Sequence, residues 1–467
     1  MGKTHEFDFC VLGAGSAGYA AAVIARDLGK SVALADGTGP LAGLCILRGC
    51  MPSKTLLRSA EVAHLAAKAA EVGVIVRDVR PDMTAIIERK RRIIQGFAEY
   101  RVEGIEKFPL FRGAPRFTGA RELKVGEDVL RAQKFLIATG SIVDVPDIAG
   151  LKETGFLTSD DVLELERLPK SIIVLGGGPV ACELAQYLAR CGSDVTMVQR
   201  SVTLLSDEDE DVGEALETAL EKEGIAVVTG TKLASVDRKD GKKRVVFEGA
   251  GHLEERSADE ILLALGRRAK VEGFDFEAAG VVYDRDGIKV DGYLRTSNPD
   301  VYAAGDCNGL NQLVHVAVYE GQLAARNAFG ETARAAEYDL QYARAVFTDP
   351  QVAIAGCTER ECRNLGIAYS KAVYPFSDLG KGIATNLTEG FVKMLAARDG
   401  RILGVAIVGA EASDMIHEAI ALLYFKANVR DVLEMPHLHP TLAEIITYPA
   451  EELNERLERE THVLVRP

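Results

Sequence analysis

The sequence predicts an α/β protein with two doubly wound parallel-sheet domains followed by a C-terminal α+β domain. Three observations lead to this prediction. A glycine-rich turn at residues 13–18 joins a short apolar strand to an alanine-rich helix. The same strand–turn–helix–strand pattern recurs around residues 176–181, with equal spacing to the end of the following strand. From about residue 341, alternating apolar segments precede two helices, which indicates a mostly antiparallel sheet.

The composition is that of a globular enzyme with several packed domains. The chain has 467 residues, of which 47% are apolar and 27% charged, and this balance argues against disorder. The net charge is −14 and no basic block is present, so we expect no nucleic-acid partner. The first residues are acidic where a signal peptide is basic, and glycines and charges interrupt residues 9–35. We therefore expect a cytoplasmic protein without a membrane partner.

The first glycine-rich turn predicts a dinucleotide site. Gly13, Gly15 and Gly18 form the fingerprint, and Asp36 ends the next strand. Helical N–H groups and the helix dipole bind a pyrophosphate, and an acid at this strand end accepts hydrogen bonds from ribose hydroxyls. The alternative is a tight turn without a ligand. It is disfavoured by Asp306, a second carboxylate at a strand–helix junction, which suits a polyol such as ribityl. We therefore expect FAD at this turn.

The second glycine-rich turn predicts a nicotinamide nucleotide site. Its fingerprint is Gly176, Gly178 and Ala181, and the following strand ends at Gln199. NAD-binding enzymes place an acid at this strand end, whereas an amide followed by Arg200 suits the 2′-phosphate of NADP.

A run of acids at residues 207–211 lies close to this site in the sequence. Negative charge there would repel a 2′-phosphate. We interpret the run as a solvated helix N-terminus, where acids are favourable. The sequence leaves NAD and NADP as open alternatives, with NADP slightly favoured by local chemistry.

Two cysteines separated by four residues, Cys45 and Cys50, are spaced as a functional pair. A thiol near a helix N-terminus and a cation has a lowered pKa, so Cys50, just ahead of a helix predicted at 53–70, is the better thiolate candidate. Structural cysteines and metal ligands are the alternatives. No further Cys or His follows at short spacing, so we predict no metal site. The remaining cysteines are interpreted as buried apolar residues: Cys10, Cys182, Cys191, Cys307, Cys357 and Cys362.

The C-terminal region offers a histidine that can act as a base. His437 and His439 precede Glu444 by a few residues. An imidazole accepts a thiol proton near neutral pH, and a carboxylate on its other nitrogen fixes the tautomer.

In combination, the segments 43–54, 138–140, 302–306 and 439–444 resemble the class I pyridine nucleotide-disulfide oxidoreductases, most of all the dihydrolipoyl dehydrogenase branch. The resemblance extends from residue 7 to about residue 452. It implies a homodimer in which a C-terminal dimerisation domain completes the active site of the other subunit. The implied domains are an FAD domain at 1–150 and 271–340, an NAD(P) domain at 151–270 and an interface domain at 341–467.

The resemblance also implies individual roles. Cys50 would contact the flavin while Cys45 exchanges with the substrate disulfide, and His439 would be the base that Glu444 orients. His437 is then an ordinary surface or supporting residue. The other implied cofactor residues are Lys54, Thr139, Gly140 and Gly305 for FAD, and Glu183 and Gly266 for NAD(P).

Glu183 has an alternative structural interpretation, and Pro179 departs from the family pattern. Glu183 is the expected ion-pair partner of Lys54, although such a pair is also a common structural device. Relatives often carry an aromatic residue, which covers the flavin, where this chain has Pro179. A proline cannot swing as such a lid, so we expect a more open flavin face and measurable oxidase activity toward O2.

The predicted function is an FAD-dependent dithiol/disulfide oxidoreductase. It would move electrons between a dihydrolipoyl group, Cys45–Cys50, FAD and NAD(P), and its substrate would be a small dithiol or a separate lipoyl-bearing protein. One alternative is an NADPH-dependent reductase of a small disulfide, of the glutathione reductase type. A mercuric reductase is less favoured, because such relatives carry a terminal thiol pair that is not seen here. A non-catalytic redox sensor or scaffold would not need Cys45, Cys50, His439 and Glu444 together.

Overall fold

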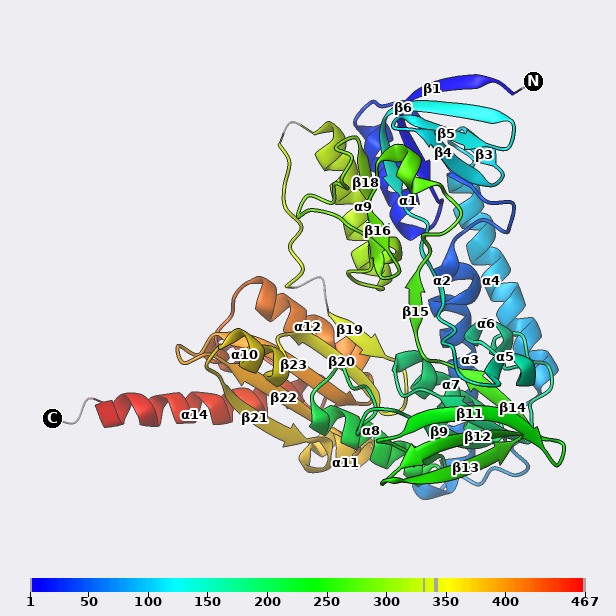
Figure 1. Cartoon of the computed structure of the whole chain (residues 1–467). Helices are drawn as coiled ribbons and strands as arrows, with labels where there is room; N and C mark the ends of the chain where they lie inside the picture. The colour runs from blue at the N-terminus through cyan, green and yellow to red at the C-terminus, as the bar shows by residue number, and fades with distance from the viewer. Residues whose placement is uncertain (1, 331, 340–342, 465–467) are drawn as a thin grey trace. The chain divides into compact units, whose positions relative to one another are not determined.

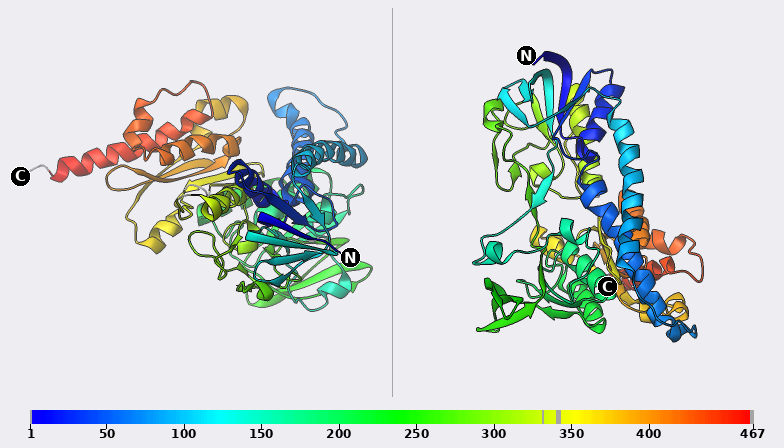
Figure 2. Two further views of the ribbon diagram at one scale, coloured as in Figure 1. Left: turned by 90° about the horizontal axis from the view of Figure 1, so that it is seen from above. Right: turned by 90° about the vertical axis from the view of Figure 1, so that its right-hand side faces the viewer.

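The computed structural model describes residues 2–330, 332–339 and 343–464, with side chains described up to residue 459 (Figure 1). The chain divides into two compact units. Unit 1 consists of Met1–Thr55, Ile87–Asp144 and Gly266–Gln341, and unit 2 consists of Leu56–Ile86, Val145–Leu265 and Tyr342–Pro467. The division falls within two long helices that lie side by side in Figure 2, α3 (Cys50–Lys68) and α4 (Met83–Ile105).

Unit 1 is built on a mixed sheet with the strand order β3-β2-β1-β6-β5-β4, and β18 also pairs with β6. The strands β3, β2, β1, β6 and β18 are parallel, whereas β5 and β4 extend antiparallel from β6. Their bounds are β1 (Thr4–Leu12), β2 (Val32–Asp36), β3 (Leu110–Arg112), β4 (Pro115–Gly119), β5 (Glu122–Val125), β6 (Asp128–Ile137) and β18 (Val301–Ala303). The smaller strands are β7 (Ser141–Val143), β15 (Arg267–Ala269), β16 (Tyr283–Asp284) and β17 (Gly287–Ile288).

Two helices of unit 1, α1 (Ser16–Asp27) and α9 (Val314–Phe329), pack closely against each other beside this sheet (Figure 1). Their contact depends on small residues, because a Cβ on Gly321 would lie 2.2 Å from the Ala17 carbonyl oxygen. This contact and the apolar strands form a continuous core under the first glycine-rich turn.

Unit 2 contains a parallel sheet in the order β10-β9-β8-β14 and an antiparallel sheet in the order β11-β12-β13. The parallel strands are nearly continuous apolar runs, as strands covered on both faces require. The bounds are β8 (Ser171–Leu175), β9 (Asp194–Val198), β10 (Ala226–Val228), β11 (Lys232–Lys239), β12 (Lys242–Gly249), β13 (His252–Ala258) and β14 (Glu260–Leu263). The helices here are α5 (Leu151–Thr154), α6 (Ser159–Val162), α7 (Pro179–Arg190) and α8 (Glu210–Lys222).

The C-terminal part of unit 2 is an antiparallel sheet in the order β19-β20-β23-β22-β21, and α12 packs on β20 and β23 (Figure 1). The strands are β19 (Arg344–Val346), β20 (Gln351–Gly356), β21 (Ser370–Pro375), β22 (Phe391–Ala396) and β23 (Ile402–Gly409). The helices are α10 (Glu359–Leu365), α11 (Gly380–Thr385), α12 (Ala412–Tyr424), α13 (Val429–Glu434) and α14 (Thr447–Leu464).

The predicted fold class is confirmed: two strand–turn–helix–strand units and a C-terminal α+β segment are present. The helix expected at 53–70 begins earlier, at Cys50. Pro52 is then in the first turn, where the missing N–H costs nothing. Among the described residues, no helix is both long and apolar enough to cross a membrane.

Candidate active site

The first fingerprint turn is shaped by glycines that have no room for a side chain. Gly13 has a φ of 103°, and a Cβ there would lie 2.2 Å from the Ala138 carbonyl oxygen. A Cβ on Gly18 would lie 1.9 Å from the Gly13 carbonyl oxygen. Gly15 is the N-cap of α1, and the atom nearest to a Cβ on Gly15 would be Gly43 Cα at 3.9 Å. The first N–H groups of α1, which have no partner within the helix, therefore lie beside open backbone suited to a pyrophosphate.

Asp36 lies at the end of β2 beside this turn, as expected. Its carboxylate accepts the Ala14 N–H at 2.9 Å and the Gly37 N–H at 2.7 Å. A cavity of about 350 Å³ opens next to it, within the size range of ligand pockets. The cavity is lined by residues that include Gly13, Asp36, Thr38, Gly113, Thr139 and Lys270. The glycine cradle, the acid and the cavity together fit the adenosine and pyrophosphate part of FAD.

The residues predicted for the rest of this site lie at the end of β6 and after β18. Thr139 Oγ1 donates a hydrogen bond to the Lys270 carbonyl at 2.7 Å, and the Gly140 carbonyl accepts the Lys270 N–H at 2.9 Å. Asp306 Oδ2 accepts Ser141 Oγ at 2.6 Å. Arg267 Nε donates to the same hydroxyl at 3.0 Å, so Ser141 links the Arg267 guanidinium to the Asp306 carboxylate. Neither Ser141 nor Arg267 was predicted from the sequence as part of this site.

Glu320 is a further acid of this site that the sequence analysis did not identify. It is fully buried in α9 and accepts hydrogen bonds from the Gly305 N–H at 2.6 Å, Asn308 Nδ2 at 2.8 Å and the Tyr338 hydroxyl at 2.7 Å. Burial raises its pKa in spite of these bonds. Glu320 thereby holds the turn that carries Asp306. Glu320 follows the apolar Val316 by four residues, so the helical period places both on the same face of α9. This spacing was the one indication in the sequence that Glu320 could be buried.

The two predicted redox cysteines are brought together by close backbone packing. Cys45 lies in α2 (Leu44–Arg48), and Cys50 is the first residue of α3. A Cβ on Gly49 would lie 3.0 Å from Cys45 Cα, which allows the chain to fold back. Gly43 has a φ of 81°, and its Cβ would lie 2.8 Å from Gly15 Cα. The cysteine loop therefore rests directly on the fingerprint turn.

Cys45 and Cys50 have different electrostatic surroundings. Both are reduced thiols and partly buried. A hydrogen bond with Cys50 raises the pKa of Cys45 and burial raises it further, whereas Lys54 acts in the opposite direction. Cys50 lies at the N-terminus of α3, where helical N–H groups favour a thiolate.

The two C-terminal histidines have different environments. The His439 side chain is 77% exposed, and its Nδ1 lies 3.0 Å from Glu444 Oε2. Glu444 is buried and is also held by the Thr441 N–H at 3.0 Å. His437 is 11% exposed and uses both ring nitrogens, one on Glu418 and one on the Met435 carbonyl. Only His439 thus combines a carboxylate on Nδ1 with an accessible ring.

The second fingerprint turn repeats the geometry of the first. Gly176 has a φ of 120°, and its Cβ would lie 2.4 Å from the Ala264 carbonyl oxygen. Gly178 caps α7, and a Cβ there would meet nothing within 4 Å. Ala181 is fully buried in that helix. The turn and the start of α7 fit a nucleotide pyrophosphate.

Gln199 and Arg200 lie at the end of β9, next to this turn. Gln199 is buried, and its amide oxygen accepts the Arg200 N–H at 3.1 Å. A Cβ on Gly177 would lie 2.9 Å from Gln199 Cγ. Arg200 is exposed and, within the residues that the structure describes, has no ion-pair partner. Its guanidinium is therefore available to a ligand.

The other two residues assigned to this site have structural contacts. Glu183 is buried in unit 2 and accepts the Phe347 N–H at 3.0 Å. Its expected partner, Lys54, belongs to unit 1. Gly266 has a φ of 118°, and its carbonyl accepts the Asp144 N–H at 3.0 Å.

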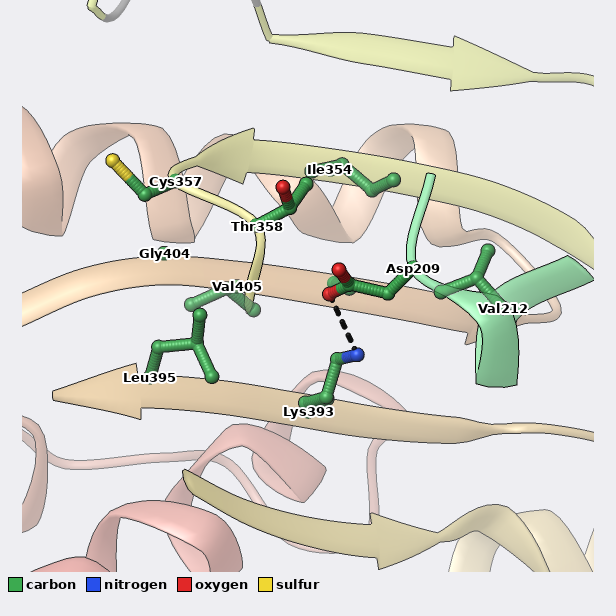
Figure 3. A pocket seen from close by; sticks show the side chains of 10 residues that line it. Asp209, Val212, Ile354, Cys357, Thr358, Lys393, Leu395, Gly404 and Val405 are labelled. Atoms are coloured by element: carbon green, nitrogen blue, oxygen red, sulfur yellow. Dashed lines mark hydrogen bonds and ion pairs between the residues drawn. The ribbon is translucent and has the colours of Figure 1, made fainter. Parts of the chain in front are cut away.

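The acidic run 207–211 lies at the N-terminus of α8, as expected, but the expectation that all of it is solvated is wrong. Asp209 is 6% exposed and lies 2.8 Å from the ammonium of Lys393, which is 1% exposed (Figure 3). Lys393 also contacts Asp211 at 2.7 Å, and Glu208 pairs with Arg344. Burial alone would lower the pKa of Lys393, but these acids raise it. Lys393 and Arg344 therefore compensate part of the negative charge of the run within unit 2.

Two family models together cover most of this chain. Residues 7–321 match the pyridine nucleotide-disulphide oxidoreductases, and residues 342–450 match the dimerisation domain of the same family. The chain belongs to this family. As a pyridine nucleotide-disulphide oxidoreductase it uses FAD and a nicotinamide nucleotide, as the two fingerprints predict.

Curated relatives of this oxidoreductase include dihydrolipoyl dehydrogenases and mercuric reductases. A dihydrolipoyl dehydrogenase of Thermus scotoductus is 36% identical over an alignment of 477 positions, which spans 98% of this chain and 99% of the relative. A mercuric reductase of Bacillus cereus is 34% identical over 446 residues, which cover 94% of this chain and 70% of the relative. The flavoprotein disulfide reductase RclA of Escherichia coli shares the fold, with a TM-score of 0.86, 23% identity and coverage of 96% and 100% of the two chains.

The contact between Gly43 and Gly15 predicts a local stability effect. Gly43→Ala is expected to lower the free energy of unfolding by about 1–3 kcal/mol, because its Cβ would meet backbone and its φ is left-handed. The FAD content of the purified protein should fall with it. Gly39→Ala is the matched control, because nothing lies within 4 Å of a Cβ there. Equal denaturation midpoints and FAD contents for the two variants would contradict this account of the loop.

Proposed function

We propose that this oxidoreductase oxidises a dihydrolipoyl dithiol to its cyclic disulfide and delivers the electron pair to a nicotinamide nucleotide. The observation that carries the proposal is the contact between Cys45 and Cys50, which raises the pKa of Cys45 and lies in a loop that packs on the FAD fingerprint turn. The dihydrolipoyl dehydrogenase of Thermus scotoductus, which matches this chain over nearly the full length of both, supports the lipoyl substrate. Bound FAD supplies the two-electron carrier between thiols and nucleotide.

The residues of this chain have separable roles in the proposed exchange. With the pair oxidised, a substrate thiolate attacks Cys45 Sγ, the Cys45–Cys50 bond breaks, and Cys50 leaves as a thiolate. The second substrate thiol then displaces Cys45, which closes the substrate disulfide and leaves the enzyme dithiol. His439 takes the substrate thiol proton at Nε2, because Glu444 binds Nδ1.

We infer a homodimer in which the partner subunit's His439 serves this exchange. The C-terminal segment around His439 exposes large apolar side chains: Tyr424 at 67%, Phe425 at 78% and Leu438 at 81%. Exposed apolar patches of this kind mark association surfaces. They lie in the segment that matches the family dimerisation domain.

Reduction of mercuric ion is the second candidate function. Relatives named mercuric reductase match the chain at 33–34% identity, close to the 36% of the dihydrolipoyl dehydrogenase. A soft metal ion would be held by the same thiol pair. The two candidates differ in the direction of electron flow: dithiol to nucleotide in the first, NADPH to metal ion in the second.

An anaerobic titration followed by absorbance separates these candidates. The expected result is that dihydrolipoamide reduces the purified yellow protein and that NAD+ or NADP+ reoxidises it. Mercuric ion or glutathione disulfide, added with NADPH, should give slower turnover. If dihydrolipoamide leaves the spectrum unchanged while NADPH with mercuric ion turns over, the lipoyl assignment is wrong and the mercuric one is supported.

We propose NADP(H) as the preferred nucleotide. The support is the exposed guanidinium of Arg200 and the partial compensation of the nearby acids by Lys393 and Arg344. Arg200→Ala is expected to lower kcat/KM for NADP+ by about tenfold or more while changing that for NAD+ little, because a charge-assisted bond to the 2′-phosphate is lost. Lys242→Ala, at an exposed position of β12, is the control. Equal losses for both nucleotides would contradict the assignment.

A further inference from the structure

A second pair of cysteines has the same spacing as the redox pair. Four residues separate Cys357 and Cys362, as four separate Cys45 and Cys50. Cys357 directly follows β20, and Cys362 lies in the first turns of α10, whose N-cap is Thr358. The sequence alone suggested buried apolar roles for both.

The fold brings these two thiols into contact. Their side chains are hydrogen-bonded to each other, and both pack in a small cluster with Leu395 and Leu403. The backbone around them is fixed: the Cys357 N–H bonds the Leu403 carbonyl at 2.9 Å, and the Cys362 N–H bonds the Thr358 carbonyl at 2.9 Å. Both are reduced thiols in the structure.

The two thiols differ in accessibility. Cys357 is partly exposed, whereas Cys362 is fully buried. Burial, the neighbouring thiol and the acids Glu361 and Asp209 raise the pKa of Cys362 to about 12. Figure 3 shows Cys357 across a small cavity from the ion pair of Lys393 and Asp209. An oxidant therefore reaches Cys357 first, and Cys362 is placed to resolve the product.

We propose that Cys357 and Cys362 are a second, reversible redox site that closes to a disulfide on reaction with a peroxide. Cys357 Sγ attacks a peroxide oxygen, the O–O bond breaks, and the first water leaves with the thiol proton. Cys362 Sγ then attacks Cys357 Sγ, the S–O bond breaks, and the second water takes the Cys362 proton. One hydrogen peroxide becomes two waters, and the two thiols lose two electrons.

The pair of Cys357 and Cys362 lies where α10 contacts the segment 206–209. Asp209 accepts the N–H groups of Glu359 and Arg360 at 3.0 and 3.1 Å, and so caps the helix that holds Cys362. Arg360 reaches back to the Ser206 carbonyl at 2.6 Å. These contacts join α10 to the segment that follows Gln199 and Arg200. A disulfide would therefore form where the nucleotide-binding and C-terminal segments meet.

Tryptic mapping of the full-length flavoprotein tests the proposal. Arg360 lies between the two cysteines, so trypsin leaves Cys357 in peptide 345–360 and Cys362 in peptide 361–363. After hydrogen peroxide, acid quenching and alkylation under denaturing conditions, we expect a linked peptide lighter by two hydrogens than its parts. It should disappear after treatment with dithiothreitol. Cys45 and Cys50 fall in peptides 31–48 and 49–54 and form the internal positive control.

Two variants isolate the second pair. The double variant Cys45→Ser/Cys50→Ser should still give the linked peptide, because the second site needs no electrons from the first. Cys357→Ser should remove it and leave Cys362 fully alkylated after denaturation; an unchanged thermal midpoint shows that the variant folds. If both cysteines are alkylated while Cys45–Cys50 is fully oxidised, or if Cys357 is oxidised without a link to Cys362, the proposal is wrong.

Discussion

Cys45→Ser is expected to lower turnover with dihydrolipoamide by about 10⁴-fold or more, as loss of a covalent nucleophile does. The serine hydroxyl can still donate to the Cys50 thiolate, so the loop geometry should persist. What is lost is the sulfur that exchanges with the substrate. The measurement is steady-state reduction of NAD+ or NADP+ by dihydrolipoamide.

Cys50→Ser is the matched partner of this variant and should lose turnover to a similar extent, because no disulfide can form. Both variants should retain nucleotide-dependent reduction of an artificial dye, which needs no thiol. That activity separates loss of thiol chemistry from loss of folding or of FAD. Dithiol turnover within tenfold of the parent protein in either variant would remove the Cys45–Cys50 pair from the mechanism.

His439→Gln is expected to lower kcat/KM for dihydrolipoamide by about 10²- to 10⁴-fold, the usual contribution of a general base. The residual activity should also lose the limb of its pH profile that reports the imidazole. Glutamine keeps a polar group beside Glu444, so stability should change little. The measurement is kcat/KM across pH for the variant and the parent protein.

His437→Gln is the control for this prediction. Its ring is buried between Glu418 and the Met435 carbonyl, so the variant should lose stability but keep the pH profile of turnover. If His437→Gln changes the pH profile and His439→Gln does not, the two roles have been assigned the wrong way round.

The parts of the fold set by local pattern were predictable from the sequence. The glycine fingerprints and short apolar strands depend on neighbours within a few residues, and β8 and β9 begin and end where the apolar runs do. The start of α3 was predicted three residues late, at Ser53; the helix includes Pro52 because the first turn of a helix accepts proline. No element was predicted for the stretch that forms α4.

The features that the sequence did not reveal depend on distant partners. Asp209 and Asp211 pair with Lys393, which lies more than 180 residues later in the chain, so their environment cannot be inferred from the local run of acids. Cys357 and Cys362 have the spacing of the redox pair, but only the fold shows that they touch. Glu320 meets Gly305 and Tyr338 from different segments of the chain. Local patterns report secondary structure, whereas tertiary contacts decide which charges and thiols are buried.

Lys393 limits how this protein can be recombined with its relatives. Its ammonium is buried, and its partners come from two segments: Asp209 and Asp211 at the start of α8, and Glu359 at the start of α10. Exchanging the nucleotide-binding segment alone would remove Asp209 and Asp211 and leave the buried ammonium with only Glu359 of these three acids, at a cost of about 3–5 kcal/mol. A chimaera designed to change nucleotide preference should therefore transfer these acids and Lys393 together, or else alter only Gln199 and Arg200.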